Sequence, residues 1–224
     1  LQQRIGWMYP INTHLKSIID KILTDPRWDM KFIGMQIVIE GLALSAFTTT
    51  RETTPDPVLK DVVYLVTRDE ARHVTFGVNY LEEFVKTLSQ EEKEERAQFA
   101  YEACVVSRER LVATDVFRYF GWDVEEARQQ VLEGFVMSTF RNLLFQRVVP
   151  NLKRIGLLTD KIRPKFEELG ILDYENLSTD GDIDWTALER PLDTEEAQSY
   201  EQSMLAAFAA EHEKQEAADT SDAA

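Results

Sequence analysis

Residues 32–47 read FIGMQIVIEGLALSAF, and this stretch decides the fold. Its apolar residues occupy almost every side of a helix, which is typical of a helix buried in a protein core. Asp25-Pro26 supplies an N-cap followed by a proline at the first helical position, so we expect a helix over 26–51. The stretch has only 16 residues and carries Glu40 near its centre, and it is therefore too short and too interrupted for a membrane span. The sequence predicts a buried helix with a carboxylate in its middle.

The rest of the body also reads as helices that begin at capping signals. Asp56-Pro57 repeats the Asp-Pro signal, and both Ser89-Gln90-Glu91-Glu92 and Asp123-Val124-Glu125-Glu126 have the spacing of a capping box. From these signals we expect helices over 57–88, 90–121 and 124–150 or slightly past, and a shorter helix over 13–24 precedes them all. Helices of about 30 residues are about 45 Å long, which favours an antiparallel bundle. We therefore expect an all-α antiparallel bundle over 1–156.

The charge of the chain is concentrated behind this body. The net charge is −15, and residues 173–224 hold 15 acidic and 2 basic side chains. We expect 157–192 to be an irregular, loop-rich C-terminal wrap and 193–224 to be an acidic and largely disordered tail. No concentrated basic face is present, which excludes a nucleic-acid partner.

The cysteine content and the first residues both bear on location. The single cysteine, Cys104, excludes a disulfide framework and indicates a reducing compartment. The chain opens with Leu1, and residues 1–10 lack the pattern of a signal peptide. We expect a cytoplasmic protein without a membrane span, whose N-terminus is processed or truncated.

The chemistry is carried by Glu70-Ala71-Arg72-His73, a Glu-x-x-His motif inside the second long helix. A spacing of three places the carboxylate and the imidazole on one helical face, where both can bind one metal ion. Taken alone the motif is weak, because 24 glutamates and three histidines give a chance match in about one sequence in three. Glu40 strengthens it, since a buried carboxylate costs several kcal/mol unless it is paired or metal-bound. Pairing of Glu40 with an arginine of a neighbouring helix remains the alternative.

The register of the first two long helices points to the same site. Glu40 and Glu70 each lie 15 residues from position 55, which falls within the predicted turn 53–57. Residues equidistant from the turn of an antiparallel hairpin lie at the same height, here about 20 Å down each helix. We therefore expect the two carboxylates to face each other. Asp69 is a candidate to accept the second N–H of a metal-bound His73, the alternatives being an ordinary contact with His73 or a salt bridge to Arg72.

These residues resemble those of the ferritin-like di-iron carboxylate proteins, in particular the ribonucleotide reductase small-subunit-like oxidases and the amine N-oxygenases. The resemblance covers about residues 25–90 by motif and extends to about 155 by helix pattern. It implies that Glu40, Glu70 and His73 are metal ligands with Asp69 behind them, and that two iron ions, or manganese and iron, are the cofactors. It further implies an oxidoreductase that activates O2 to oxidise a small organic substrate.

The sequence departs from that family in one respect, because it contains no second Glu-x-x-His. Ile11 and Ala209 stand three positions before His14 and His212. Either an upstream helix pair has been lost, which we favour, or a partner subunit such as a second copy completes the site. We expect this chain alone to bind metal weakly and to be inactive.

Two other function classes stay open: a metal-binding or storage protein of the same fold, and a metal-free structural bundle. A substrate tunnel lined by side chains such as Ile37, Leu44 and Phe47 would favour the enzyme. Small residues near the proposed ligands leave room for O2 or substrate, or else permit close helix packing: Gly41, Ala43, Ser45 and Gly77.

Overall fold

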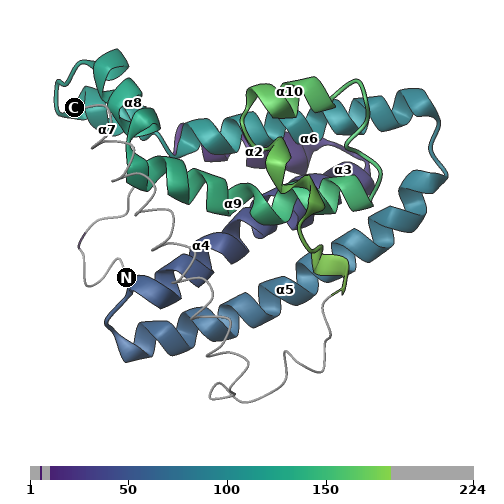
Figure 1. Cartoon of the computed structure of the whole chain (residues 1–224), viewed down its shortest axis with the longest axis horizontal. Helices are drawn as coiled ribbons and strands as arrows, with labels where there is room; N and C mark the ends of the chain where they lie inside the picture. The colour runs from purple at the N-terminus through teal and green to yellow at the C-terminus, as the bar shows by residue number, and fades with distance from the viewer. Residues whose placement is uncertain (1–5, 7–10, 183–224) are drawn as a thin grey trace, which may run out of the picture.

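The described part of the chain, which is Gly6 and residues 11–182 of a computed structural model, folds through helices and contains no strand (Figure 1). The expected all-α class is therefore confirmed for these residues. The elements in chain order are α2 (Thr13–Thr24), α3 (Trp28–Phe32), the π-helix η1 (Ile33–Ile39), α4 (Glu40–Thr53), α5 (Pro57–Lys86), α6 (Gln90–Arg110), α7 (Thr114–Tyr119), α8 (Val124–Glu133), α9 (Phe135–Arg154), α10 (Arg163–Glu168) and the 3-10 turns η2 (Leu172–Asn176) and η3 (Asp180–Asp182). The proposed tail 193–224 lies outside the described residues.

Three helices start at the capping signals of the sequence, namely α5, α6 and α8. The Asp56 carboxylate accepts hydrogen bonds from the backbone N–H groups of Val58 and Leu59 at the start of α5. Ser89 and Glu92 form the reciprocal capping box that opens α6. Each bond satisfies an amide that has no partner inside its own helix, which is why these residue types begin helices. The bounds predicted for α2 and the starts predicted for α5, α6 and α8 are confirmed.

The helix expected over 26–51 differs in two ways from the structure. It begins at Trp28, because the Asp25 carboxylate accepts the backbone N–H of Arg27 at 2.9 Å and also binds its guanidinium. It is also not α-helical throughout, since residues 33–39 form the π-helix η1 between α3 and α4. The backbone is nevertheless helical without interruption from Trp28 to Thr53.

The two later helices are shorter than predicted. α6 ends at Arg110, and Ala113 takes a left-handed backbone conformation with φ of 52° before α7 begins, so the helix does not reach residue 121. The helix predicted to run to about Pro150 is divided by an extended Gly134 into α8 and α9. Glycine has a low helix propensity, which explains the break. Pro150 lies inside α9, which continues to Arg154.

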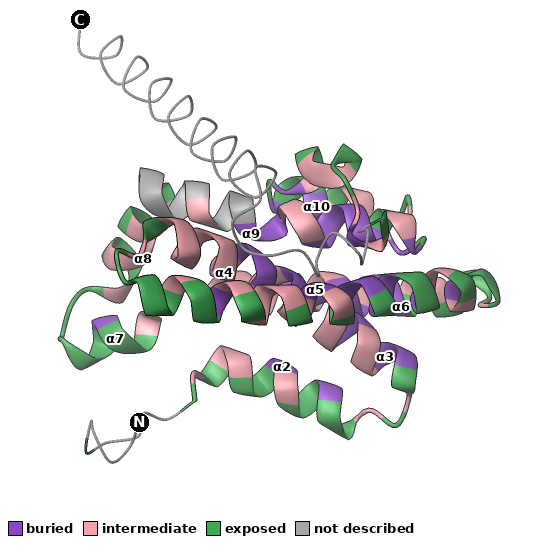
Figure 2. Ribbon diagram, turned by 90° about the horizontal axis from the view of Figure 1, so that it is seen from below, coloured by how far each residue is buried: buried purple, intermediate pink, exposed green. Residues whose placement is uncertain are grey.

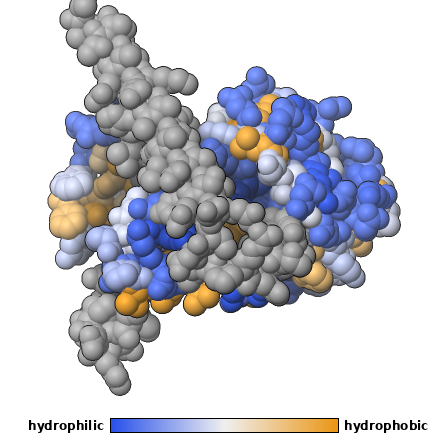
Figure 3. All heavy atoms as spheres, turned by 60° about the horizontal axis from the view of Figure 1, so that its bottom comes forward, coloured by the Kyte–Doolittle hydropathy of each residue, from blue (hydrophilic) through white to orange (hydrophobic). Residues whose placement is uncertain are grey.

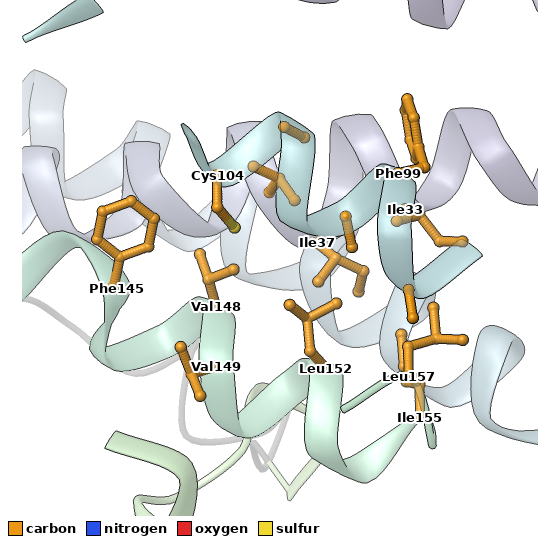
Figure 4. Packing of buried hydrophobic residues seen from close by; sticks show 14 of the residues in the cluster. Ile33, Ile37, Phe99, Cys104, Phe145, Val148, Val149, Leu152, Ile155 and Leu157 are labelled. Carbon is orange, nitrogen blue, oxygen red and sulfur yellow. The ribbon is translucent and has the colours of Figure 1, made fainter. Parts of the chain in front are cut away.

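α4 and α5 form a helical hairpin that lies beside α9 (Figure 1). η1 and α6 close the other side of the core, where side chains from η1, α6 and α9 converge (Figure 4). Glycines at two positions allow neighbouring helices to approach each other closely. A Cβ on Gly77 would lie 2.6 Å from the Cβ of Gln36, and one on Gly41 would lie 3.3 Å from Val148. At these two positions the small residues serve close helix packing.

The helical run Trp28–Thr53 is longer than the apolar stretch from which the absence of a membrane span was expected. It has 26 residues and is long and apolar enough to cross a membrane by length and composition. The 16-residue apolar stretch is shorter than the helix that contains it. The same properties belong to the core helix of a soluble protein, and here the run packs against α5, α6 and α9.

Residues 157–182, the described portion of the expected C-terminal wrap, pack on α9 and α5. The anchor is Asp180, which is buried and whose carboxylate binds Arg147 and, at 2.7 Å, the amide of Asn151. Its backbone carbonyl accepts the Thr75 hydroxyl of α5 at 2.8 Å. The wrap is therefore tied by one buried residue to both helices beneath it.

Candidate metal centre

Glu40, Glu70 and His73 come together where the start of α4 lies beside the middle of α5. Glu40 is the first residue of α4, while the other two lie one turn apart on α5. Each offers one potential ligand atom, and the three atoms lie within 4.8 Å of one another. The expected clustering of these side chains is therefore confirmed as geometry.

The π-helix sets the position of Glu40 on its helix. The backbone N–H of Glu40 donates to the carbonyl of Met35, five residues earlier, and so ends η1. A π-turn contains one residue more than the corresponding α-turn, and such turns are frequent at functional sites. Buried residues on both sides of this junction, Val38 and Gly41, hold it in the core.

Glu40 is partly buried, and its surroundings disfavour the charged form of its carboxyl group. Its Oε2 atom is buried and has no hydrogen-bond partner among the described residues. Burial raises the pKa of Glu40 above its usual 4.5, the nearby Glu70 raises it further, and His73 lowers it. The repulsion expected between the two carboxylates is present, but burial is the larger cause of the raised pKa.

His73 is held by its own motif. Its Nδ1 lies 3.1 Å from Oε2 of Glu70, and its side chain is 59% exposed. Asp69 does not take the expected position behind it, since its carboxylate binds Arg72 at 3.2 Å and its side chain points to solvent with 61% exposure. This is the salt bridge that the sequence left as an alternative, and the partner of His73 is Glu70.

Comparisons with protein-family models, curated proteins and solved structures find no match. The assignment of the site therefore depends on its residues and their geometry.

Gln36, on the same helical run as Glu40, is a partly buried polar residue that the sequence analysis did not single out. It lies one turn before Glu40, and its Oε1 is likewise buried without a hydrogen-bond partner among the described residues. Its side chain packs where Gly77 of α5 leaves space. A polar residue four positions before Glu40 in an otherwise apolar stretch was the signal that could have identified it.

An apolar pocket beside α4 is separate from these ligand atoms. It has a volume of about 450 Å³ and lies between α2, α4, α6 and α9. Phe47 lines it, but Ile37 and Leu44 do not, because both are fully buried in the core. Neither Glu40, Glu70 nor His73 lines this pocket, so the pocket does not reach the centre.

Proposed function

We propose that Glu40, Glu70 and His73 are one half of a di-iron, or manganese–iron, carboxylate centre. In the complete assembly this centre would belong to an oxidoreductase that activates O2 to oxidise a small organic substrate. The observation that carries the proposal is the convergence of the three donors from a hairpin whose register places them at one height. Carboxylate oxygens with imidazole nitrogen suit iron and manganese.

The surroundings of Glu40 support a missing cation. A metal-free structural bundle would pair this carboxylate with an arginine, yet its Oε2 has no hydrogen-bond partner among the described residues. A buried acceptor without a partner costs about 1–3 kcal/mol. A cation bound between Glu40 and Glu70 would remove both this cost and the repulsion between the two carboxylates.

The chain's own residues would hold and orient such ions. Glu40 would bind from the core side, and Glu70 is placed to bridge between Glu40 and His73. His73 must release its contact with Glu70 if Nδ1 is to bind metal, or else bind through its other nitrogen. The ions, when bound, supply the positions at which O2 is reduced.

One half-site does not provide the full donor set. Di-iron centres of this class use four carboxylates and two histidines, and the described cluster supplies two and one. We therefore expect weak metal binding and no turnover from the chain alone. A storage protein of the same fold would share this donor set and would differ only in lacking substrate oxidation. The cytoplasmic location stays a prediction.

Metal binding by variants tests the ligand assignment. Titration with Mn²⁺, followed by electron paramagnetic resonance, should show binding to the wild-type chain that Glu40→Ala and His73→Ala each reduce at least about tenfold. His14→Ala is the matched control, because His14 lies in the first turn of α2, away from the cluster. Equal binding by all four proteins would rule out this centre.

Substrate chemistry requires the complete assembly. Iron content and O2 consumption should be measured side by side on this chain and on the longest product of its gene. We expect O2 consumption only where two irons are bound per site. Iron binding without O2 consumption coupled to oxidation of an organic compound would favour the storage function.

A further inference from the structure

The apolar pocket beside α4 contains two polar groups that no described residue satisfies. Ser107 and Arg110 lie one turn apart at the end of α6, and both line the pocket. Ser107 is only 8% exposed, and its hydroxyl makes no hydrogen bond among the described residues. The exposed Arg110 forms neither a hydrogen bond nor an ion pair within the same part of the chain. A hydroxyl buried without a partner costs free energy, which a ligand that bonds to it recovers.

The carboxylate next to Arg110 in the sequence does not neutralise it. Both oxygens of Glu109 accept a hydrogen bond from Arg128 at 2.9 Å, and one of them also lies 3.4 Å from Arg108. An arginine side chain has donors but no acceptor, whereas a serine hydroxyl can donate to any acceptor. Arg110 and Ser107 together therefore suit a ligand group that accepts hydrogen bonds and carries a negative charge.

The rest of the pocket is apolar, and its walls come from α2, α4, α6 and α9. These apolar side chains include Leu15, Ile19, Leu42, Phe47, Phe140 and Leu144. The buried and intermediate residues of α2 turn toward the rest of the molecule and its exposed residues turn away from it, so α2 serves as one wall (Figure 2). An apolar lining with a few polar groups is usual for a small-molecule site, and the volume of about 450 Å³ lies within the usual range.

The pocket differs from the apolar side chains that are scattered over the surface. On the face drawn in Figure 3, apolar side chains lie in separate areas among polar ones. Single exposed apolar residues are normal on a protein surface and indicate no ligand. In the pocket, apolar side chains of several helices line one common space. An apolar ligand in that space is removed from water on several sides at once, which favours its binding.

We propose that this pocket binds an apolar carboxylate about as large as two fused aromatic rings. The carboxylate accepts hydrogen bonds from Ser107 and Arg110, and the apolar body of the ligand lies among the side chains of α2, α4 and α9. The site is separate from the candidate metal centre, because none of the three proposed metal ligands lines the pocket. It therefore goes beyond the proposed function and does not depend on it.

The first experiment titrates the full 224-residue chain with 2-naphthoate and, as the neutral counterpart, with 2-naphthylmethanol. Ligand-detected nuclear magnetic resonance measures both affinities. We expect a Kd for 2-naphthoate of about 0.1–1 mM and a Kd for the alcohol about fivefold higher. Added salt should weaken the binding of 2-naphthoate but not that of the alcohol, because only the carboxylate pairs with Arg110. Absence of 2-naphthoate binding up to about 10 mM overturns the site.

Two variants test the position of the carboxylate. Arg110→Gln should weaken the binding of 2-naphthoate about fivefold and leave that of 2-naphthylmethanol unchanged. Ser107→Ala should weaken the binding of both ligands, because the hydroxyl can donate to either head group. Arg118→Gln is the matched control, since Arg118 of α7 is also an exposed arginine and lies outside the pocket lining. Equal affinity of the wild type and Arg110→Gln for 2-naphthoate overturns the placement of the carboxylate.

Two further variants test the position of the apolar body. Ala43 and Ala46 of α4 both line the pocket, so Ala43→Leu and Ala46→Leu each fill part of its space. Each should weaken the binding of both ligands at least about tenfold, because the added methyl groups overlap with the ligand. Circular dichroism checks that the variants keep their helices, and the second variant serves if the first does not fold. Unchanged affinity for both ligands in a folded variant of each alanine overturns the pocket as their binding site.

Discussion

Replacing Asp180 with alanine should destabilise the protein, because this residue ties the C-terminal wrap to α9. Asp180 is 3% exposed, and its carboxylate accepts hydrogen bonds from Arg147 and Asn151. In Asp180→Ala the Asn151 amide, which is fully buried, loses that acceptor, at a cost of about 1–3 kcal/mol. Loss of the ion pair with Arg147, whose side chain is 27% exposed, adds about 1 kcal/mol after allowance for solvent screening.

The expected loss is therefore about 2–4 kcal/mol, which for a chain of this size lowers Tm by roughly 4–16 °C. Thermal unfolding followed by circular dichroism, together with urea titration, measures both quantities. Asp182→Ala is the control: its side chain is 73% exposed although it binds Arg154 at 2.8 Å, and it should cost less than about 1 kcal/mol. Equal Tm values for the two variants would refute the idea that Asp180 anchors the wrap.

Three other residues give predictions of their own. In the absence of metal, Glu40→Gln should stabilise the chain by about 1 kcal/mol at pH 7, because it removes a charge whose Oε2 is buried without a partner among the described residues. The pKa of Glu40 is raised in the folded chain, so the wild-type carboxyl group becomes neutral as the pH falls toward 4.5. Urea titrations should therefore show the gain in stability shrinking over that range. Gly77→Ala should destabilise the chain by about 1–3 kcal/mol in the same titration, since its Cβ would lie 2.6 Å from that of Gln36, and a stabilised variant would show that α5 can move away. Cys104 is fully buried and burial raises its pKa to about 12, so a thiol reagent at pH 8 should modify it only after unfolding; rapid labelling of the native chain would contradict this.

Local signals accounted for the starts of α5, α6 and α8 but not for the interruptions of the predicted helices. An aspartate or serine at an N-cap satisfies free amides within a few residues, so the sequence shows it directly, as at Asp56 and Ser89. The interruptions are the left-handed Ala113 and the extended Gly134. Only a weak local preference marked Gly134, and none marked Ala113.

At the candidate metal centre, the register of the two helices could be predicted from the sequence, but the contacts of individual side chains could not. The meeting of Glu40 with Glu70 could be predicted because the turn between two antiparallel helices fixes their register. The contact of Asp69 with Arg72 could not, because it depends on rotamers at an exposed position where several partners lie within reach. Gln36 was missed because a single amide in an apolar stretch carries no motif, although its buried Oε1, like Oε2 of Glu40, has no hydrogen-bond partner among the described residues.

The π-helix before Glu40 also affects how chains of this kind should be aligned. Successive side chains of an α-helix are rotated by about 100°, so one extra residue would normally turn every later side chain away from its neighbours. The wider turns of η1 accommodate such an extra residue within 33–39, so the side chains before and after η1 keep the directions that a regular α-helix would give them. A homologue lacking that one residue could form a regular α-helix here and still present a glutamate to Glu70. Counting residues without a gap across this segment would then assign the ligand to the wrong position.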